Sequence, residues 1–175
     1  KGRQKFKKSL AILGRLLAEE RGSQVAVIEL GGWDTHANQG GITGTLSAGF
    51  ERLSKGLLEL KMALGETWKE TVVVVASEFG RTVSGNGTGG TDHGTGGLGM
   101  VLGGSVAGGV VHGDWPGLAR KQLYEGRDLR RTTDIRSVFK SILRDHMHLS
   151  GRSLDRDVFP DSQQIPVLEG LIRRS

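Results

Sequence analysis

Two kinds of hydrophobic pattern alternate along the first half of the chain. Residues 4–21 and 45–64 carry apolar side chains at helical spacing, and each stretch ends at a glycine. QVAVIEL (24–30) and TVVVVAS (71–77) are instead apolar on both faces, which is typical of central parallel strands covered by helices. The resulting order predicts an α/β fold, with a largely parallel sheet sandwiched between helices. In such folds the functional residues follow the carboxyl ends of the strands.

The middle of the chain is rich in glycine. About half of the 29 glycines fall within residues 80–117. Short apolar pieces at 98–103 and 106–112 interrupt this segment and predict two further strands, as a hairpin or at a sheet edge. We therefore interpret the segment as a site loop rather than a linker.

The C-terminal part returns to helical spacing over residues 134–148, with Thr133 as the expected N-cap. From residue 150 we expect an extended tail that ends in a short helical turn at LEGLI (168–172). The chain length suits a single domain over residues 1–175.

Charge and composition exclude several classes of function. The formal net charge is +5, but residues 1–8 hold five basic side chains and no acidic one, so the remainder is neutral. A basic end is not a basic face, and we expect no nucleic-acid partner. The chain has no cysteine, so any metal must be held by His, Asp, Glu or backbone oxygen. We also expect no membrane span and no signal peptide in this sequence.

Polar residues follow the first predicted strand in GGWDTHANQG. Asp34 and His36 are two positions apart, so in an extended chain both side chains point the same way, with about 7 Å between Cα atoms. This spacing suits one divalent ion, zinc or manganese. Asp92 and His93 form a second cluster in GTDHGTGG. The alternative is that Asp34 only satisfies amide groups of its glycine-rich turn.

A third cluster closes the second predicted strand. Glu78 is a candidate metal ligand, and Arg81 is a candidate catalytic residue that holds an anionic oxygen. These two residues are alternatively a structural ion pair. Asp92 is also a candidate metal ligand, but it is better suited to hydrogen-bond a metal-binding side chain than to bind the metal itself. We assign no site role to the remaining histidines, His112, His146 and His148.

Three motifs in this order, GGWDTHANQ, SEFGRT and GTDHGTGG, resemble the bacterial family called domain of unknown function 1501. The resemblance covers about residues 20–150. It implies an alkaline phosphatase-like fold, related to those of sulfatases and cofactor-independent phosphoglycerate mutases. By this resemblance Asp34, His36 and His93 hold one divalent metal ion, zinc in the first instance.

The sequence departs from the superfamily pattern at two points. Glu78 matches the acid of a second metal site, but Phe79 replaces the imidazole, which weakens that site. The nucleophilic Ser or Thr and a further metal-binding Asp belong to an N-terminal half that is missing here. The resemblance therefore implies the C-terminal part of an exported hydrolase that acts on a small anionic ester, a phosphate or sulfate monoester, and that is incomplete on its own. The alternative function is a non-catalytic binding module with a degenerate site.

Overall fold

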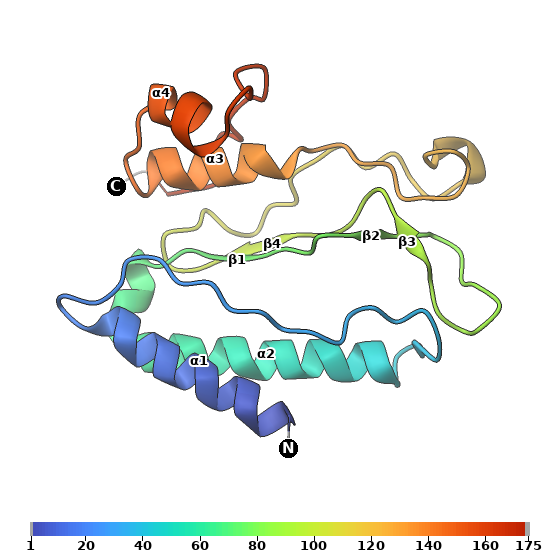
Figure 1. Cartoon of the computed structure of the whole chain (residues 1–175), viewed down its shortest axis with the longest axis horizontal. Helices are drawn as coiled ribbons and strands as arrows, with labels where there is room; N and C mark the ends of the chain where they lie inside the picture. Colours follow the sequence, from blue (N-terminus) through green and yellow to red (C-terminus); the bar gives the residue numbers. More distant parts are fainter. Residues whose placement is uncertain (1, 174–175) are drawn as a thin grey trace. The chain divides into compact units, whose positions relative to one another are not determined.

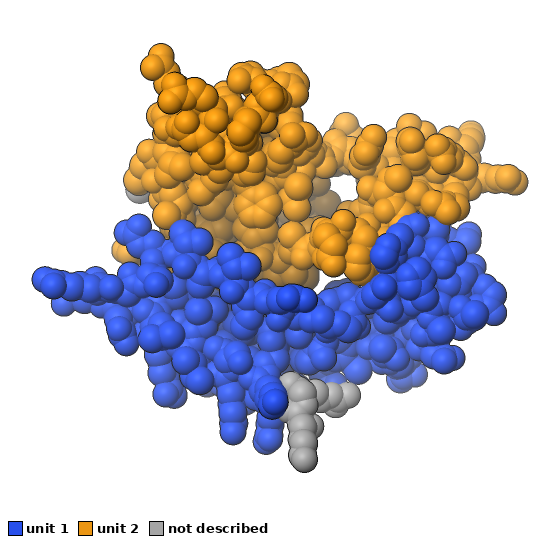
Figure 2. Space-filling model, in the orientation of Figure 1, with its two compact units in different colours: residues 1–68, 82–93 blue, residues 69–81, 94–175 orange. Residues whose placement is uncertain are grey.

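The computed structural model describes residues 2–173 and divides into two compact units (Figure 2). Unit 1 contains the residues up to Trp68 together with Thr82–His93, and unit 2 contains Lys69–Arg81 together with the chain from Gly94 onward. The expectation of one domain over residues 1–175 stays a prediction. No helix in the described range is long and apolar enough to span a bilayer.

Unit 1 is built on two packed helices, α1 (Gly2–Ala18) and α2 (Thr45–Leu64) (Figure 1). Both confirm the helices predicted from apolar spacing. Phe6 and Leu10 of α1 are buried, and Gly56 of α2 provides the space for them, because a Cβ atom there would overlap the Phe6 ring. Burial of each such side chain contributes about 1.5–3 kcal/mol. At its C-terminus α2 ends at Gly65, whose φ of 56° lies in the left-handed region.

The predicted strand at 24–30 is wrong, since no strand is assigned there among the described residues. The side chain of Val27 is 95% exposed. An apolar run signals a tendency to be buried, but a strand also needs a neighbouring edge that supplies hydrogen bonds.

Unit 2 contains a short antiparallel ladder. Strand β1 (Val73–Val75) pairs with β4 (Met100–Leu102), with Val74 opposite Val101. Two-residue strands, β2 (Gly80–Arg81) and β3 (His93–Gly94), lie where the chain passes from one unit to the other. The predicted strands at 71–77 and 98–103 are thus present in shorter form. A parallel, alkaline phosphatase-like sheet sandwiched by helices stays a prediction.

Helix α3 (Ile135–Asp145) covers this ladder through Ile142, which clusters with Leu171 and Ile172. Its N-cap is Asp134 and not Thr133 as predicted, because the Asp134 carboxylate accepts a hydrogen bond of 2.9 Å from the backbone N–H of Arg136. The guanidinium of Arg136 also bonds this carboxylate and lowers the pKa of Asp134 below its ordinary value.

The C-terminal tail differs from the extended prediction. It forms α4 (Gly151–Ser153) and the π-helical turn η3 (Leu154–Val158). Two 3-10 turns lie earlier in the chain, η1 (Gly65–Glu70) and η2 (Arg120–Gln122). LEGLI forms a turn and not a helix, and the piece at 106–112 contributes only one bridge, from Val106 to Ile172.

Buried Lys140 fixes the tail, since its ammonium bonds the Asp155 carboxylate at 2.6 Å and two backbone carbonyls. Sequence spacing does not reveal such a polar anchor.

Candidate metal centre

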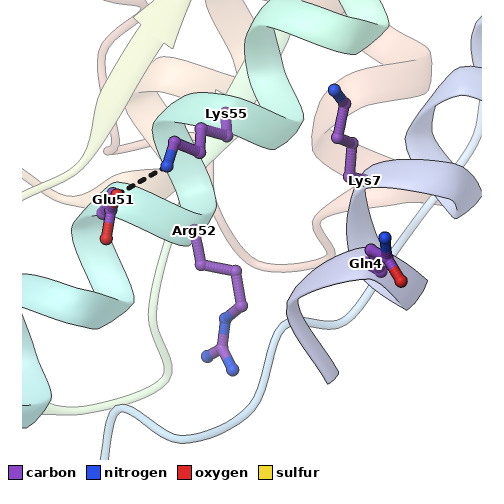
Figure 3. A pocket seen from close by; sticks show the side chains of 5 residues that line it. All are labelled: Gln4, Lys7, Glu51, Arg52 and Lys55. Carbon is purple, nitrogen blue, oxygen red and sulfur yellow. Dashed lines mark hydrogen bonds and ion pairs between the residues drawn. The ribbon is translucent and has the colours of Figure 1, made fainter. Parts of the chain in front are cut away.

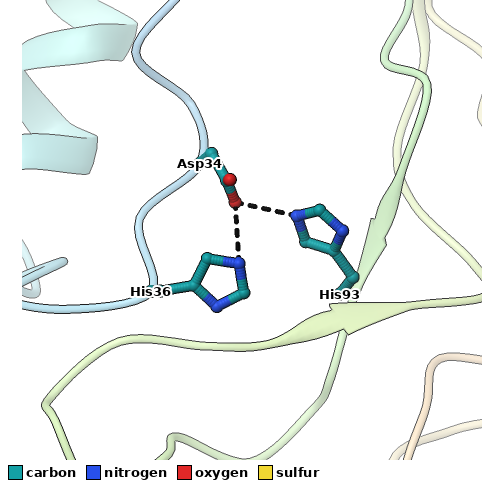
Figure 4. A group of neighbouring side chains, drawn as sticks. All are labelled: Asp34, His36 and His93. Carbon is teal, nitrogen blue, oxygen red and sulfur yellow. Dashed lines mark hydrogen bonds and ion pairs between the residues drawn. The ribbon is translucent and has the colours of Figure 1, made fainter.

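Asp34, His36 and His93 converge within unit 1 (Figure 4). The Asp34 Oδ1 atom lies 3.1 Å from His36 Nε2 and 2.8 Å from His93 Nε2. One ligand atom from each residue lies within 4.8 Å of the other two. The sequence predicts this convergence, and the structure contains it. The role of the three side chains as metal ligands stays a prediction.

The segment that carries Asp34 and His36 is attached to helix α2. The Trp33 ring packs edge-on against Phe50, with ring centroids 5.1 Å apart. Gly49 leaves room for that ring, because a Cβ atom there would already lie 3.4 Å from it. Arg52 donates a hydrogen bond to the Gly31 carbonyl at the start of the motif. The tryptophan of GGWDTH therefore acts as an anchor beside the site.

The segment that carries His93 is bound to this first segment by backbone hydrogen bonds. The N–H groups of Asn38 and Gln39 donate to the carbonyls of Thr88 and Gly89, at 3.1 and 2.9 Å. The Thr91 N–H donates to the Thr35 carbonyl at 3.3 Å. These bonds bring together residues separated by about fifty positions in sequence.

Gln39 adds a side-chain link between the same two segments. Its Oε1 atom accepts hydrogen bonds from the hydroxyls of Thr35 and Thr91, both at 2.8 Å. Thr35 is buried, so its hydroxyl needs this partner. Neither Gln39 nor the two threonines were predicted from the sequence as site residues. Their only signal in the sequence is their position inside the two motifs.

Gly90 explains why the second segment is rich in glycine. A Cβ atom at this position would lie 2.3 Å from the His36 carbonyl group and from the Thr35 carbonyl oxygen. Only a residue without a side chain allows the two backbones to approach so closely. The glycine thus permits the approach of the segments that bear the two histidines.

Asp92 lies behind His36 rather than within the group of three. Its Oδ1 atom is 3.2 Å from His36 Nδ1, the ring nitrogen that faces away from Asp34. The group of three potential ligands does not include Asp92, and the direct ligand role predicted for it from the sequence stays a prediction. A role behind the ligand, the alternative preferred from sequence, agrees with this contact.

Glu78 and Arg81 belong to unit 2. Glu78 is exposed, and the Arg81 guanidinium lies 4.8 Å from the centroid of the Phe79 ring. The Arg81 N–H donates to the Gly96 carbonyl at 3.2 Å. Both proposed roles, Glu78 as a ligand at a second site and Arg81 as an anion contact, stay predictions.

A separate hollow of unit 1 lies between α1 and α2 (Figure 3). Its lining contains amide, ammonium, guanidinium and carboxylate groups, and Lys55 donates to Glu51 there. None of the described residues that line it carries an imidazole or a hydroxyl group. The hollow is lined by Gln4, Lys7, Glu51, Arg52 and Lys55, and none of these is one of the three side chains drawn in Figure 4.

Comparison with known families gives one assignment. The family model described as "Protein of unknown function (DUF1501)" matches residues 2–158. This chain belongs to the DUF1501 family. No curated protein and no solved structure matches it.

The DUF1501 match includes the whole candidate centre. Asp34, His36 and His93 all fall inside the matched residues, as does the SEFGRT motif. The first and third motifs of the resemblance thus supply the three side chains, and the carbonyls of Thr88 and Gly89, just before the third motif, accept two of the hydrogen bonds that join the segments.

Proposed function

We propose that this DUF1501 chain binds one zinc ion through Asp34, His36 and His93. We further propose that it is the metal-binding part of an alkaline phosphatase-like hydrolase of phosphate or sulfate monoesters. The single observation that supports the proposal is the group of two imidazole nitrogens and one carboxylate oxygen that point toward one another. Two imidazoles with a carboxylate are a donor set that zinc uses in catalytic sites.

The spacing of the donor atoms fits a small tetrahedral ion. Two ligands that bind zinc at about 2.0 Å at tetrahedral angles lie about 3.3 Å apart. The contacts of Asp34 Oδ1 with the two imidazole nitrogens, 3.1 and 2.8 Å, are slightly shorter than this value. An inserted ion therefore requires Asp34 Oδ1 to move away from the two nitrogens by up to about 0.5 Å, while the two nitrogens, which lie within 4.8 Å of each other, come to a similar spacing.

The exposure of the group favours a reactive site over a structural one. The side chains of His36, Asp34 and His93 are 48%, 53% and 50% exposed. Structural zinc sites use four protein ligands, whereas catalytic sites use three and leave a position open to solvent or substrate. A divalent ion held here would supply Lewis-acid polarisation of a phosphoryl or sulfuryl oxygen.

The remaining roles in the proposed hydrolase are carried by other residues. Arg81 would hold an anionic oxygen of the ester through its planar guanidinium, and Glu78 would border a second, weakened metal position. The resemblance assigns the nucleophile to a preceding half of the protein. Export to the periplasm is likewise proposed from the resemblance. The replacement of an imidazole by Phe79 favours the second candidate, a non-catalytic binding module on the same scaffold.

Calorimetric titration of the chelator-treated chain with zinc tests the proposal. We expect one zinc per chain, and we expect Asp34→Asn and His93→Gln to lose most of the affinity. His112→Gln is the matched control, since His112 is exposed and lies outside the group of three. Equal affinity in His93→Gln and His112→Gln would reject the site. Hydrolysis of aryl phosphate and aryl sulfate by the full-length protein then separates the two candidates, because bound zinc without turnover favours the binding module.

A further inference from the structure

The two ring nitrogens of His36 face different carboxylates. Nε2 faces Asp34 within the group of three, and Nδ1 lies 3.2 Å from Asp92. Because an ionised carboxylate can only accept a hydrogen bond, the Nδ1 atom carries the proton in the contact with Asp92. Nε2 faces the Asp34 carboxylate at a similar distance, so a bound metal ion decides the tautomer: an ion between Asp34 and Nε2 takes the Nε2 lone pair, and the proton is then on Nδ1, where Asp92 accepts it.

We propose that Asp92, held in place by Asn86, is a positioning residue that presents Nε2 of His36 to the metal and sets the affinity of the site. This inference rests on the proposed zinc site and extends it to two side chains that are not ligands. A carboxylate behind a metal-binding imidazole fixes the ring orientation and the tautomer, and it increases the electron donation to the metal. Loss of such a partner typically lowers metal affinity by about 10- to 100-fold.

Asn86 ties the carboxylate and the histidine together. Its Nδ2 group donates to Asp92 Oδ1 and to the backbone carbonyl of His36, both at 2.9 Å. One amide group therefore fixes the position of Asp92 relative to the backbone of the residue that it orients. Without Asn86 the carboxylate, which is exposed, can take other rotamers more readily.

The orientation of the Asn86 amide follows from its other contacts. Its Oδ1 atom accepts from the N–H groups of Thr88 and Gly90, at 3.1 and 3.0 Å, and from the Thr88 hydroxyl at 2.9 Å. A flipped amide would place its NH₂ group against two N–H donors. The loop thus selects the orientation in which Nδ2 faces Asp92 and His36.

The contact also explains the sequence of the loop over residues 86–92 in chemical terms. Asn86 begins the loop and Asp92 ends it, next to the proposed ligand His93, and the backbone N–H of Asn86 closes the loop on the Gly90 carbonyl at 2.8 Å. The same loop therefore contributes one proposed ligand and the support of another. In this arrangement a side chain that touches no metal still changes the affinity of the site.

Zinc titration of the full 175-residue chain tests the inference. Asp92→Ala is expected to lower zinc affinity by about 10- to 100-fold. Asp92→Asn, which keeps an oxygen for the Nδ1 proton but removes the charge, is expected to recover part of that loss. Asn86→Ala is expected to lower affinity as well, and the double variant Asn86→Ala/Asp92→Ala should lose less than the sum of the two single losses, since the two side chains share one contact. Glu20→Gln, an exposed carboxylate change in unit 1, is the matched control.

Two further readouts separate positioning from a general loss of structure. Thermal unfolding of the metal-free Asp92→Asn variant should match that of the unchanged chain, while the visible absorption band of its Co²⁺ form shifts. In ¹⁵N NMR of the zinc-loaded chain, His36 should show zinc at Nε2 and a proton at Nδ1. Zinc at Nδ1, or affinities of both Asp92 variants within twofold of Glu20→Gln, would overturn the inference and leave the zinc site intact. An unchanged chain that binds no zinc would overturn the zinc site and, with it, this inference.

Discussion

Substitution of Gly90 by alanine should weaken zinc binding without altering any proposed ligand. The added Cβ atom would lie 2.3 Å from atoms of the His36 and Thr35 carbonyl groups, about 1 Å inside ordinary van der Waals contact. These neighbours are backbone atoms and cannot rotate away. The loop must therefore move by about 1 Å from the segment that carries Asp34 and His36, and the 3.3 Å bond from Thr91 N–H to the Thr35 carbonyl is the first to break.

The size of the effect follows from the cost of overpacking. Forcing extra atoms into a tightly packed position costs about 1–3 kcal/mol. If zinc binding must restore the original approach of the two segments, this cost appears in the binding free energy. At about 1.4 kcal/mol per tenfold, the expected loss of zinc affinity is roughly 5- to 150-fold.

Gly87→Ala provides the matched control for this measurement. Gly87 lies in the same loop, its φ is outside the left-handed region, and an added Cβ atom would meet no atom within 4 Å beyond its chain neighbours. Competition with a chromophoric chelator measures the zinc affinity of both variants, and circular dichroism verifies that their helix content is unchanged. Equal zinc affinity in Gly90→Ala and Gly87→Ala would refute the conclusion that close approach of the two segments forms the site.

Three further predictions concern the stability of the scaffold. Asp134→Ala should lower the free energy of unfolding by about 1 kcal/mol in urea titrations, as loss of an N-cap does. Because the hydrogen bond with Arg136 lowers the pKa of Asp134, the stabilisation is present above the ordinary pKa of 3.8 and is lost as the pH falls through the lowered value. An equal effect of the substitution at pH 2 and pH 6 would contradict this reasoning. Lys140→Ala should cost about 2–4 kcal/mol, since it leaves a carboxylate and two carbonyls without their buried partner, and a loss under about 1 kcal/mol would argue against this anchor. Gly56→Ala should destabilise by about 1–3 kcal/mol despite the helix preference of alanine, and Phe6→Leu in the same chain should restore part of the loss, because the overlap is with the Phe6 ring.

Helices were the part of the fold that the sequence determined most directly. The spacing of leucines predicts α2 over residues 45–64, and the structure has it at Thr45–Leu64. This success reflects the local nature of helix hydrogen bonds, which join residues four positions apart. The run at 24–30 has an equally clear apolar pattern but forms no strand, because a strand depends on a distant partner that its own residues do not specify.

The three candidate ligands could be predicted from the sequence, but the side chains that hold them in place could not. Residue type and glycine context pointed to Asp34, His36 and His93, since few side chains bind metals. The sequence does not identify Gln39 and Asn86 as site residues, because amide side chains in loops commonly form local turn hydrogen bonds. Their importance comes from contacts between segments about fifty residues apart, such as the bond from Asn86 to the His36 carbonyl. Only the folded chain contains that information.

X-ray absorption at the zinc edge, on the chain loaded with one equivalent of zinc, tests the central claim most directly. The proposed centre predicts two imidazole nitrogens at about 2.0–2.1 Å with oxygen in the remaining positions, and loss of one imidazole in His93→Gln. A first shell of oxygen atoms without imidazole scattering, or a spectrum that is unchanged in His93→Gln, would contradict a zinc site built from Asp34, His36 and His93.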